Sequence, residues 1–165
     1  MAKRTPIQIY TDGACRGNPG PGGYGVVMRC GNYEKEFSAG YRLTTNNRME
    51  LLAVIIGLEA IKWSDAAVTV WSDSSYVVNA VENGSVFNWE KKNFLKKANP
   101  DLWIRFLKVY REHKVSFVWI KGHSGHPDNE RCDYLAVTAS MGPDLAMDEV
   151  YETSNVKNEL FNNLK

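Results

Sequence analysis

Residues 7–12, Ile7-Gln8-Ile9-Tyr10-Thr11-Asp12, open the part of the chain that decides the fold. Their alternating, β-rich pattern is typical of a strand with one buried face. A second β-rich run covers 26–30, and Gly31-Asn32 is a hairpin signal before a third run at 33–39. The sequence therefore predicts three antiparallel strands at the start of the chain.

After this meander the hydrophobic period becomes helical. Apolar residues over 47–63 recur at i, i+3, i+4 and i+7, and shorter runs alternate between helical and β-rich patterns. The predicted helices are 47–63, 74–82, 100–112 and 127–140, and the predicted strands between them are 67–71 and 115–120. Strands followed by alternating helices and strands predict an α/β (mixed α+β) fold, with helices on the faces of a mixed sheet.

Composition limits the class of protein. The chain has 165 residues, with 20 Lys and Arg against 19 Asp and Glu, and 44% of it is hydrophobic. This length predicts one folded domain, and the apolar content excludes disorder as the main state. The chain contains no apolar run of about 20 residues, and its N-terminus lacks the apolar core of a signal peptide. We therefore expect a soluble, cytoplasmic protein with no membrane association.

Three motifs are weaker than they first look. Residues 20–25 fit G-x-G-x-x-G, but a strand rather than a helix follows, which favours a glycine-rich turn between strands over a nucleotide site. His123, His126 and Cys132 lack a fourth zinc ligand at workable spacing. Three widely spaced cysteines favour reduced thiols over disulfides. Residues 1–141 are predicted to be the catalytic domain, and 142–165 a loosely attached tail.

Four carboxylates stand at places where strands end or helices run. Each has an ordinary explanation: Asp12-Gly13 as a turn, Glu50 as a capping-box partner of Asn47, Asp73 as an N-cap, and Asp133 as a solvated surface acid. Neighbouring strands lie only about 4.8 Å apart, however, so acids at adjoining strand ends come close together. Clustered carboxylates repel unless cations neutralise them, and hard oxygen ligands select Mg²⁺ or Mn²⁺.

A second signal is the segment 88–97, which interleaves aromatic residues with four lysines and only one acid, Glu90. Aromatic and cationic side chains together suit a nucleic-acid backbone. A solvated helix with a few core aromatics explains the same pattern equally well.

Taken together, the motifs resemble the bacterial ribonuclease HI family over about residues 5–140, in family order and with family-like spacing. The residues that carry the resemblance are Tyr10-Thr11-Asp12-Gly13-Ala14-Cys15, Gly17-Asn18-Pro19-Gly20, Thr44-Thr45-Asn46-Asn47-Arg48-Met49-Glu50-Leu51, Ser72-Asp73-Ser74, Lys121-Gly122-His123-Ser124-Gly125-His126-Pro127 and Asn129-Glu130-Arg131-Cys132-Asp133. The resemblance implies a five-stranded mixed sheet in the order 3-2-1-4-5, flanked by helices.

The resemblance also implies an activity. The family hydrolyses the RNA strand of RNA–DNA hybrids with two Mg²⁺ ions, or Mn²⁺ as a substitute, and leaves 5′-phosphate and 3′-hydroxyl ends. Asp12, Glu50, Asp73 and Asp133 match its metal-binding acids, and His123 matches its loop histidine, which assists proton transfer or product release. Glu50 also matches a residue that contacts the RNA 2′-hydroxyl, the group that distinguishes RNA from DNA.

Further positions match residues that hold the hybrid. They are Asn18, Asn46 and Asn47 in the minor groove, Thr45 at a DNA phosphate, Trp89, Lys91 and Lys92 in the basic protrusion that grips the DNA strand, and Trp103 at the base of that protrusion. Leu43 and Ser75 depart from the family pattern near these positions. The lysine segment, residues 88–97, is several residues shorter than in the best-known bacterial member of the family. The expected partner is an RNA–DNA hybrid duplex bound by a monomer with no obligate protein partner. A hybrid-binding module without catalysis and a DNA-cutting nuclease of the same fold are the alternatives.

Overall fold

The computed structural model describes residues 4–164, and its first three strands form the expected antiparallel meander. They are β1 (Ile7–Cys15), β2 (Gly20–Cys30) and β3 (Tyr33–Thr44). Ile7 pairs with Cys30 and Asp12 with Gly25 in the β1–β2 register. The hairpin at residues 31–32 joins β2 to β3, as predicted.

Two parallel strands complete the sheet on the other side of β1. β4 (Ala67–Ser72) pairs with β1, and β5 (Lys114–Trp119) pairs with β4. The strand order β3-β2-β1-β4-β5 confirms the predicted five-stranded mixed sheet. β4 ends at Ser72, which pairs with Thr11, while β1 continues to Cys15 beside β2. Asp12 of β1 and Asp73, the first residue after β4, therefore follow paired positions of neighbouring strands.

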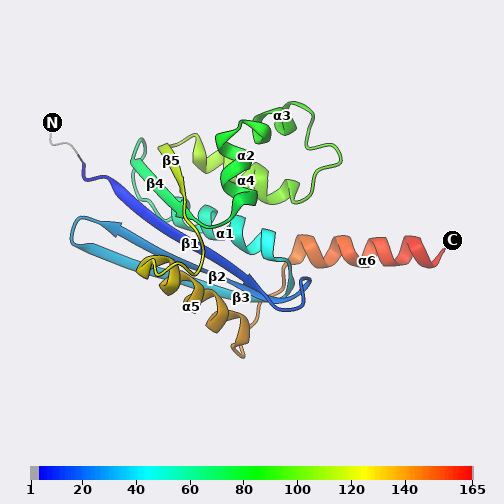
Figure 1. The fold of residues 1–165 in the computed structure, drawn as a ribbon. Helices are drawn as coiled ribbons and strands as arrows, with labels where there is room; N and C mark the ends of the chain where they lie inside the picture. Colours follow the sequence, from blue (N-terminus) through cyan, green and yellow to red (C-terminus); the bar gives the residue numbers. More distant parts are fainter. Residues whose placement is uncertain (1–3, 165) are drawn as a thin grey trace.

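Helices cover both faces of this sheet (Figure 1). They are α1 (Asn46–Glu59), α2 (Ser75–Glu82), α3 (Ser85–Lys91), α4 (Pro100–Tyr110), α5 (Pro127–Met141) and α6 (Glu149–Asn163). α1 packs on the face that carries Ile9 and Val26, where Gly57 allows close approach. α5 packs on the opposite face, against β1, β2 and β3. The main apolar core lies between α1, α4 and the sheet.

The glycine-rich stretch 20–25 is not the turn that the sequence predicts. It forms the first half of β2. A Cβ on Gly23 would lie 2.5 Å from the carbonyl oxygen of Ala136, and one on Gly25 would overlap that of Cys132. These glycines therefore let the backbone of α5 lie directly on the strand, a use that a turn-based interpretation misses.

The helix predicted at 47–63 is also shorter in the structure. α1 ends at Glu59, and the N–H of Ile61 bonds the carbonyl of Leu58 in a tighter final turn. The apolar residues beyond this point, such as Trp63, still pack against the core, but from the connection that leads to β4.

The segment after α5 is attached more firmly than the sequence suggests. Ala146 forms a bridge with Tyr41 beside β3, and its backbone hydrogen-bonds to Gly40 and Arg42, each at 2.9 Å. Asp148 is buried. α6 then projects from the body of the molecule and buries none of its described side chains (Figure 1). Within residues 4–164, no helix combines the length and apolar composition that a bilayer span requires.

Candidate active site

Asp12 lies within β1, the central strand, one residue beyond the point where β4 stops pairing with it. Its side chain is 4% exposed, and Oδ1 accepts a 2.9 Å hydrogen bond from the N–H of Gly13. A Cβ on Gly13 would overlap the backbone of Glu50. The absence of a side chain at Gly13 therefore lets α1 approach β1 at the residue beside Asp12.

Glu50 comes from the second turn of α1 and is 5% exposed. The capping-box explanation for it is wrong, because Thr45 is the N-cap and its Oγ1 accepts from the N–H of Arg48 at 3.2 Å. Glu50 is therefore free of a capping role. Its Oε2 is buried and has no hydrogen-bond partner, which is an unfavourable state for a carboxylate without a ligand.

Asp73 follows β4 and is half-buried. The N-cap explanation for it is wrong too, because Ser74 is the N-cap of α2 and accepts from the N–H of Val77 at 3.3 Å. Gly122 lies directly against the carboxylate: a Cβ there would be 2.6 Å from Asp73 Oδ2. The indole Nε1 of Trp119 donates to the Asp73 carbonyl at 3.1 Å. The loop after β5 therefore confines Asp73 from one side.

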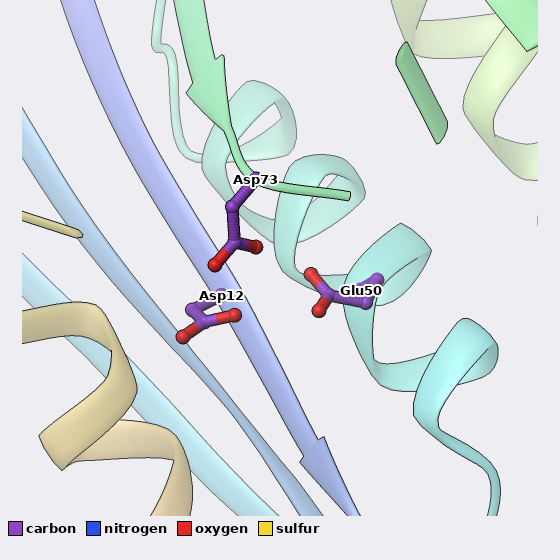
Figure 2. Close-up of side chains that lie close together, drawn as sticks. All are labelled: Asp12, Glu50 and Asp73. Carbon is purple, nitrogen blue, oxygen red and sulfur yellow. The ribbon is translucent and has the colours of Figure 1, made fainter. Parts of the chain in front are cut away.

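Figure 2 shows the carboxylates of Asp12, Glu50 and Asp73 pointing toward one another. One oxygen of each lies within 4.8 Å of the others. Burial, and then the negative charges of Asp73 and Asp133, raise the pKa of Asp12 to about 8. Burial, and then the charges of Asp12 and Asp73, raise the pKa of Glu50 well above its ordinary value. Three acids held this close are favourable only when protons or cations compensate their charge.

The donor set fits a hard divalent cation. Among residues 4–164, this is the one group of His, Cys, Asp or Glu side chains arranged to hold a metal, and all of its ligand atoms are carboxylate oxygens. The unpartnered Oε2 of Glu50 is a ready ligand. Oxygen-only sets select Mg²⁺ or Mn²⁺ over zinc. No His and Cys side chains of the described residues form a zinc site, and His126 packs against the stacked rings of Tyr10 and Trp71.

The other two predicted catalytic residues lie around this group. Asp133 is half-buried on α5, outside the three-carboxylate cluster but near enough for its charge to raise the pKa of Asp12. His123 is exposed in the loop that contains Gly122, and it adopts a left-handed backbone conformation with φ of 55°. Because Gly122 lies against the Asp73 carboxylate, the next residue, His123, is held near Asp73.

The predicted minor-groove residues gather at the start of α1. The Oδ1 of Asn18 accepts from the N–H of Asn46 at 2.9 Å, which joins the β1–β2 connection to the helix. Asn47 is exposed beside them, and Thr45 is the helix cap. The structure therefore brings these four residues together, next to the turn that carries Glu50.

The lysine segment, residues 88–97, covers the end of α3 and most of the connection to α4. Lys91 and Lys92 are exposed, and a surface hollow of about 420 Å³ is lined by Trp89, Lys92 and other residues of the segment. Glu90 is paired with Arg111 at 2.6 Å, so its charge does not offset the lysines.

Trp103 is a correction to the predicted substrate contacts. Its side chain is 0% exposed, so no duplex can touch it directly. It is large and apolar, and α4 buries it in the core, where it packs edge-on against Trp89 at 5.7 Å between ring centroids. Trp103 therefore supports the lysine segment from beneath.

Two residues of the site escaped the sequence analysis as contributors, Gly13 and Gly122. Neither carries chemistry, and each acts by lacking a Cβ beside a carboxylate-bearing residue. The available signal was their position inside the two motifs, one directly after Asp12 and one directly before His123.

Comparison with known proteins agrees with this geometry. The family model described as RNase H matches residues 4–141, which include all four carboxylates and His123. The chain belongs to the ribonuclease H family. It is 55% identical over 147 residues to the ribonuclease H of Desulforamulus reducens, covering 86% of this chain and 92% of that protein. It is 49% identical over 156 residues to that of Rippkaea orientalis, with 92% and 95% covered.

Solved ribonuclease H structures share the fold. LC9-RNase H1, a type 1 RNase H with the type 2 active-site motif, superposes with a TM-score of 0.78 at 30% identity, covering 87% of this chain and 76% of that one. LC11-RNase H1, solved in complex with an RNA/DNA hybrid, gives a TM-score of 0.61 at 33% identity, with 81% and 95% covered. This ribonuclease H is therefore a nuclease by family, and its carboxylate cluster lies inside the matched region.

Proposed function

We propose that this ribonuclease H is a metal-dependent endonuclease that hydrolyses the RNA strand of RNA–DNA hybrids and leaves 5′-phosphate and 3′-hydroxyl ends. The observation that carries the proposal is the cluster of Asp12, Glu50 and Asp73, with ligand oxygens within 4.8 Å of one another. The hybrid-bound structure of LC11-RNase H1 supports the choice of substrate. A monomer acting in the cytoplasm, without an obligate protein partner, is part of the same proposal.

Asp12, Glu50 and Asp73 would hold the metal, with Asp133 completing the set. Two bound Mg²⁺ ions, for which Mn²⁺ can substitute, would activate a water and stabilise the leaving oxygen of the phosphodiester. Glu50 would also make a second contact, in which a carboxylate oxygen other than its metal-binding Oε2 accepts a hydrogen bond from the RNA 2′-hydroxyl.

The remaining residues orient the substrate and move protons. Asn18, Asn46 and Asn47 offer amide groups to the minor groove beside Glu50, and Thr45 lies at the same helix start. His123 is solvent-exposed, so its imidazole can exchange a proton with water and carry it to or from the reacting phosphate. Lys91 and Lys92 supply positive charge for the DNA strand.

The deciding experiment replaces one carboxylate by its neutral isostere. We expect Asp12→Asn and Asp73→Asn each to lower kcat on a labelled hybrid by more than about 100-fold, because charge compensation at the reacting phosphate is lost. Hybrid affinity should remain near the wild-type value, since neither residue contributes positive charge to binding. Cleavage gels and a binding titration measure the two quantities separately.

The matched control is Asp65→Asn. Asp65 is an exposed acid before β4, at the opposite end of the sheet, and its positive φ is one that asparagine tolerates. The Asp65→Asn variant should cleave the hybrid at the wild-type rate. Excess chelator should stop the wild-type reaction, and RNA–RNA and DNA–DNA duplexes should remain uncut. Full activity of Asp12→Asn with Mg²⁺ would contradict the proposal. If the wild type bound the hybrid without cleaving it, the protein would be a binding module. If it cleaved DNA–DNA duplexes, it would be a DNA nuclease.

A further inference from the structure

Arg48 is the centre of a buried cluster next to the candidate active site. Its side chain is 4% exposed. Nε and Nη2 donate to the carboxylate of Asp148 at 2.7 and 2.9 Å. Nη1 and Nη2 donate to Asp101 at 2.9 and 2.8 Å, and Nη1 also reaches Asn99 Oδ1 at 3.3 Å. A guanidinium has five N–H groups, so this one has an acceptor for each of them.

The Arg48 cluster joins three parts of the chain that are far apart in sequence. Arg48 belongs to the first turn of α1, Asn99 and Asp101 to the start of α4, and Asp148 to the residue before α6. Asp148 also accepts from the hydroxyl of Thr44 at 2.8 Å, which ties it to the end of β3.

Hydrogen bonds continue from this cluster toward the lysine segment. The Nδ2 of Asn99 donates to the phenolic oxygen of Tyr76 at 3.1 Å, and the indole Nε1 of Trp103 donates to the same oxygen at 2.9 Å. Trp103 in turn supports Trp89 by edge-on packing. One connected set of contacts therefore runs from the start of α1 to the base of the lysine segment.

Asp148 is the deeper of the two acids that neutralise Arg48. Its side chain is 10% exposed, against 25% for Asp101. Without Asp148, the Nε side of the guanidinium would be buried with no acceptor, and Arg48 would have to move toward Asp101 or solvent. The contact that holds the start of α1 against the start of α4 would then be weakened.

We propose that Asp148 is a positioning residue for hybrid binding. Acting through Arg48, it fixes the distance between residues 45–47 and the lysine segment, so that both surfaces can contact the same hybrid duplex. The inference rests on the proposed function, because it takes both surfaces to bind the hybrid. Asp148 lies outside the matched region 4–141 and needs no contact with substrate. Residues 142–148 thereby become part of the binding apparatus.

The test variant is Asp148→Asn, which keeps the shape of the side chain and removes its charge. We expect the Kd for a labelled hybrid in chelator, and the KM with Mg²⁺, to rise roughly tenfold because the binding surface is no longer preorganised. We expect kcat to stay within about twofold of wild type, since the carboxylate cluster is untouched. All assays are run well below the melting temperature of each variant.

Two comparisons separate positioning from general stability. Glu152→Gln breaks the ion pair of Glu152 with Arg42 at 3.0 Å, which tethers the same segment without touching Arg48, and should leave Kd and KM unchanged. Arg48→Lys keeps the charge but cannot form the fork, so it should raise KM as Asp148→Asn does. The double variant should show no further rise, because both changes break one contact.

A lowered melting temperature with wild-type Kd and KM for Asp148→Asn would overturn the proposal. If that variant does not melt cooperatively, Thr44→Val and Thr44→Ser take its place. Thr44→Val removes the hydroxyl that donates to Asp148 and should raise the Kd for the hybrid. Thr44→Ser keeps that hydroxyl and should leave the Kd unchanged. Equal Kd values for the two variants would overturn the proposal. A wild type that binds hybrid but does not cut it with Mg²⁺ contradicts the proposed function and leaves the Kd comparison valid.

Discussion

Asp12 carries a carboxylate in surroundings that favour its protonated form. It is buried, it faces two other acids within 4.8 Å, and its pKa is raised to about 8. In the unfolded chain an aspartate titrates near pH 4. Between about pH 4 and pH 8 the folded protein therefore holds a proton that the unfolded chain has lost, and without metal its free energy of unfolding falls as pH rises.

This gives a prediction for the metal-free protein. In chelator, we expect the free energy of unfolding of the wild type to decrease between pH 5 and pH 9. We expect Asp12→Asn to be more stable than wild type at pH 9, by on the order of 2 kcal/mol, because its amide never ionises. Urea unfolding at the two pH values measures this.

The same experiment has a built-in control. Asp65 is exposed at the other end of the sheet, so Asp65→Asn should keep the wild-type pH dependence. If Asp12→Asn lost stability with pH as steeply as the wild type does, the pH dependence would not arise from Asp12.

At the scale of elements, β2 and α5 fit together through residues that have no side chain. Gly23 and Gly25 lie under the backbone of α5 at Ala136 and Cys132. α5 also carries Asp133, so the depth at which it sits on the sheet decides how near that acid comes to Asp12. The glycines thus affect both packing and the electrostatics of the site.

We expect Gly25→Ala to lower the free energy of unfolding by about 1–3 kcal/mol, because the added methyl group must push α5 off the sheet. Gly142→Ala is the control, since its φ is −72° and an added Cβ would be 3.5 Å from the nearest atom. Chemical denaturation measures both. Equal stability of Gly25→Ala and wild type would mean that α5 can move at little cost.

At the scale of the whole molecule, charge is nearly balanced but unevenly placed. The net charge is +1. Three acids of the site gather around the end of β4, between β1 and α1, and four lysines gather on the α3–α4 segment, where Arg111 already neutralises Glu90. In the proposed function the lysines take the DNA strand and the carboxylates take the RNA strand.

Replacing Lys91 and Lys92 together by alanine should therefore raise KM and flatten the salt dependence of hybrid binding. For every phosphate that is no longer neutralised by a lysine, the slope of log Kd against log salt should fall by about 0.9. Lys35→Ala with Lys114→Ala removes the same charge at exposed sites elsewhere and should keep the wild-type slope. Binding titrations at several salt concentrations measure the slope, and an unchanged slope would mean that these lysines are only solvated.

The sequence by itself determined most element boundaries, because these depend on local periodicity. Its motifs, through their resemblance to the family, also predicted the strand order and the residue types of the site. It predicted Asp12, Glu50 and Asp73, and the structure brings these three together. Local patterns suggested capping roles for Glu50 and Asp73, and only the helix starts of the folded chain, at Thr45 and Ser74, exclude them.

Tertiary structure alone decided what depends on contacts between distant residues. The glycines of β2 looked like a turn because their use is visible only when α5 lies on them. Trp103 looked like a substrate contact, but α4 buries it. Asp148 looked like part of a loose tail because its partner, Arg48, lies 100 residues away in the chain. Burial and pairing across such separations are properties of the assembled fold, and no local window of sequence contains them.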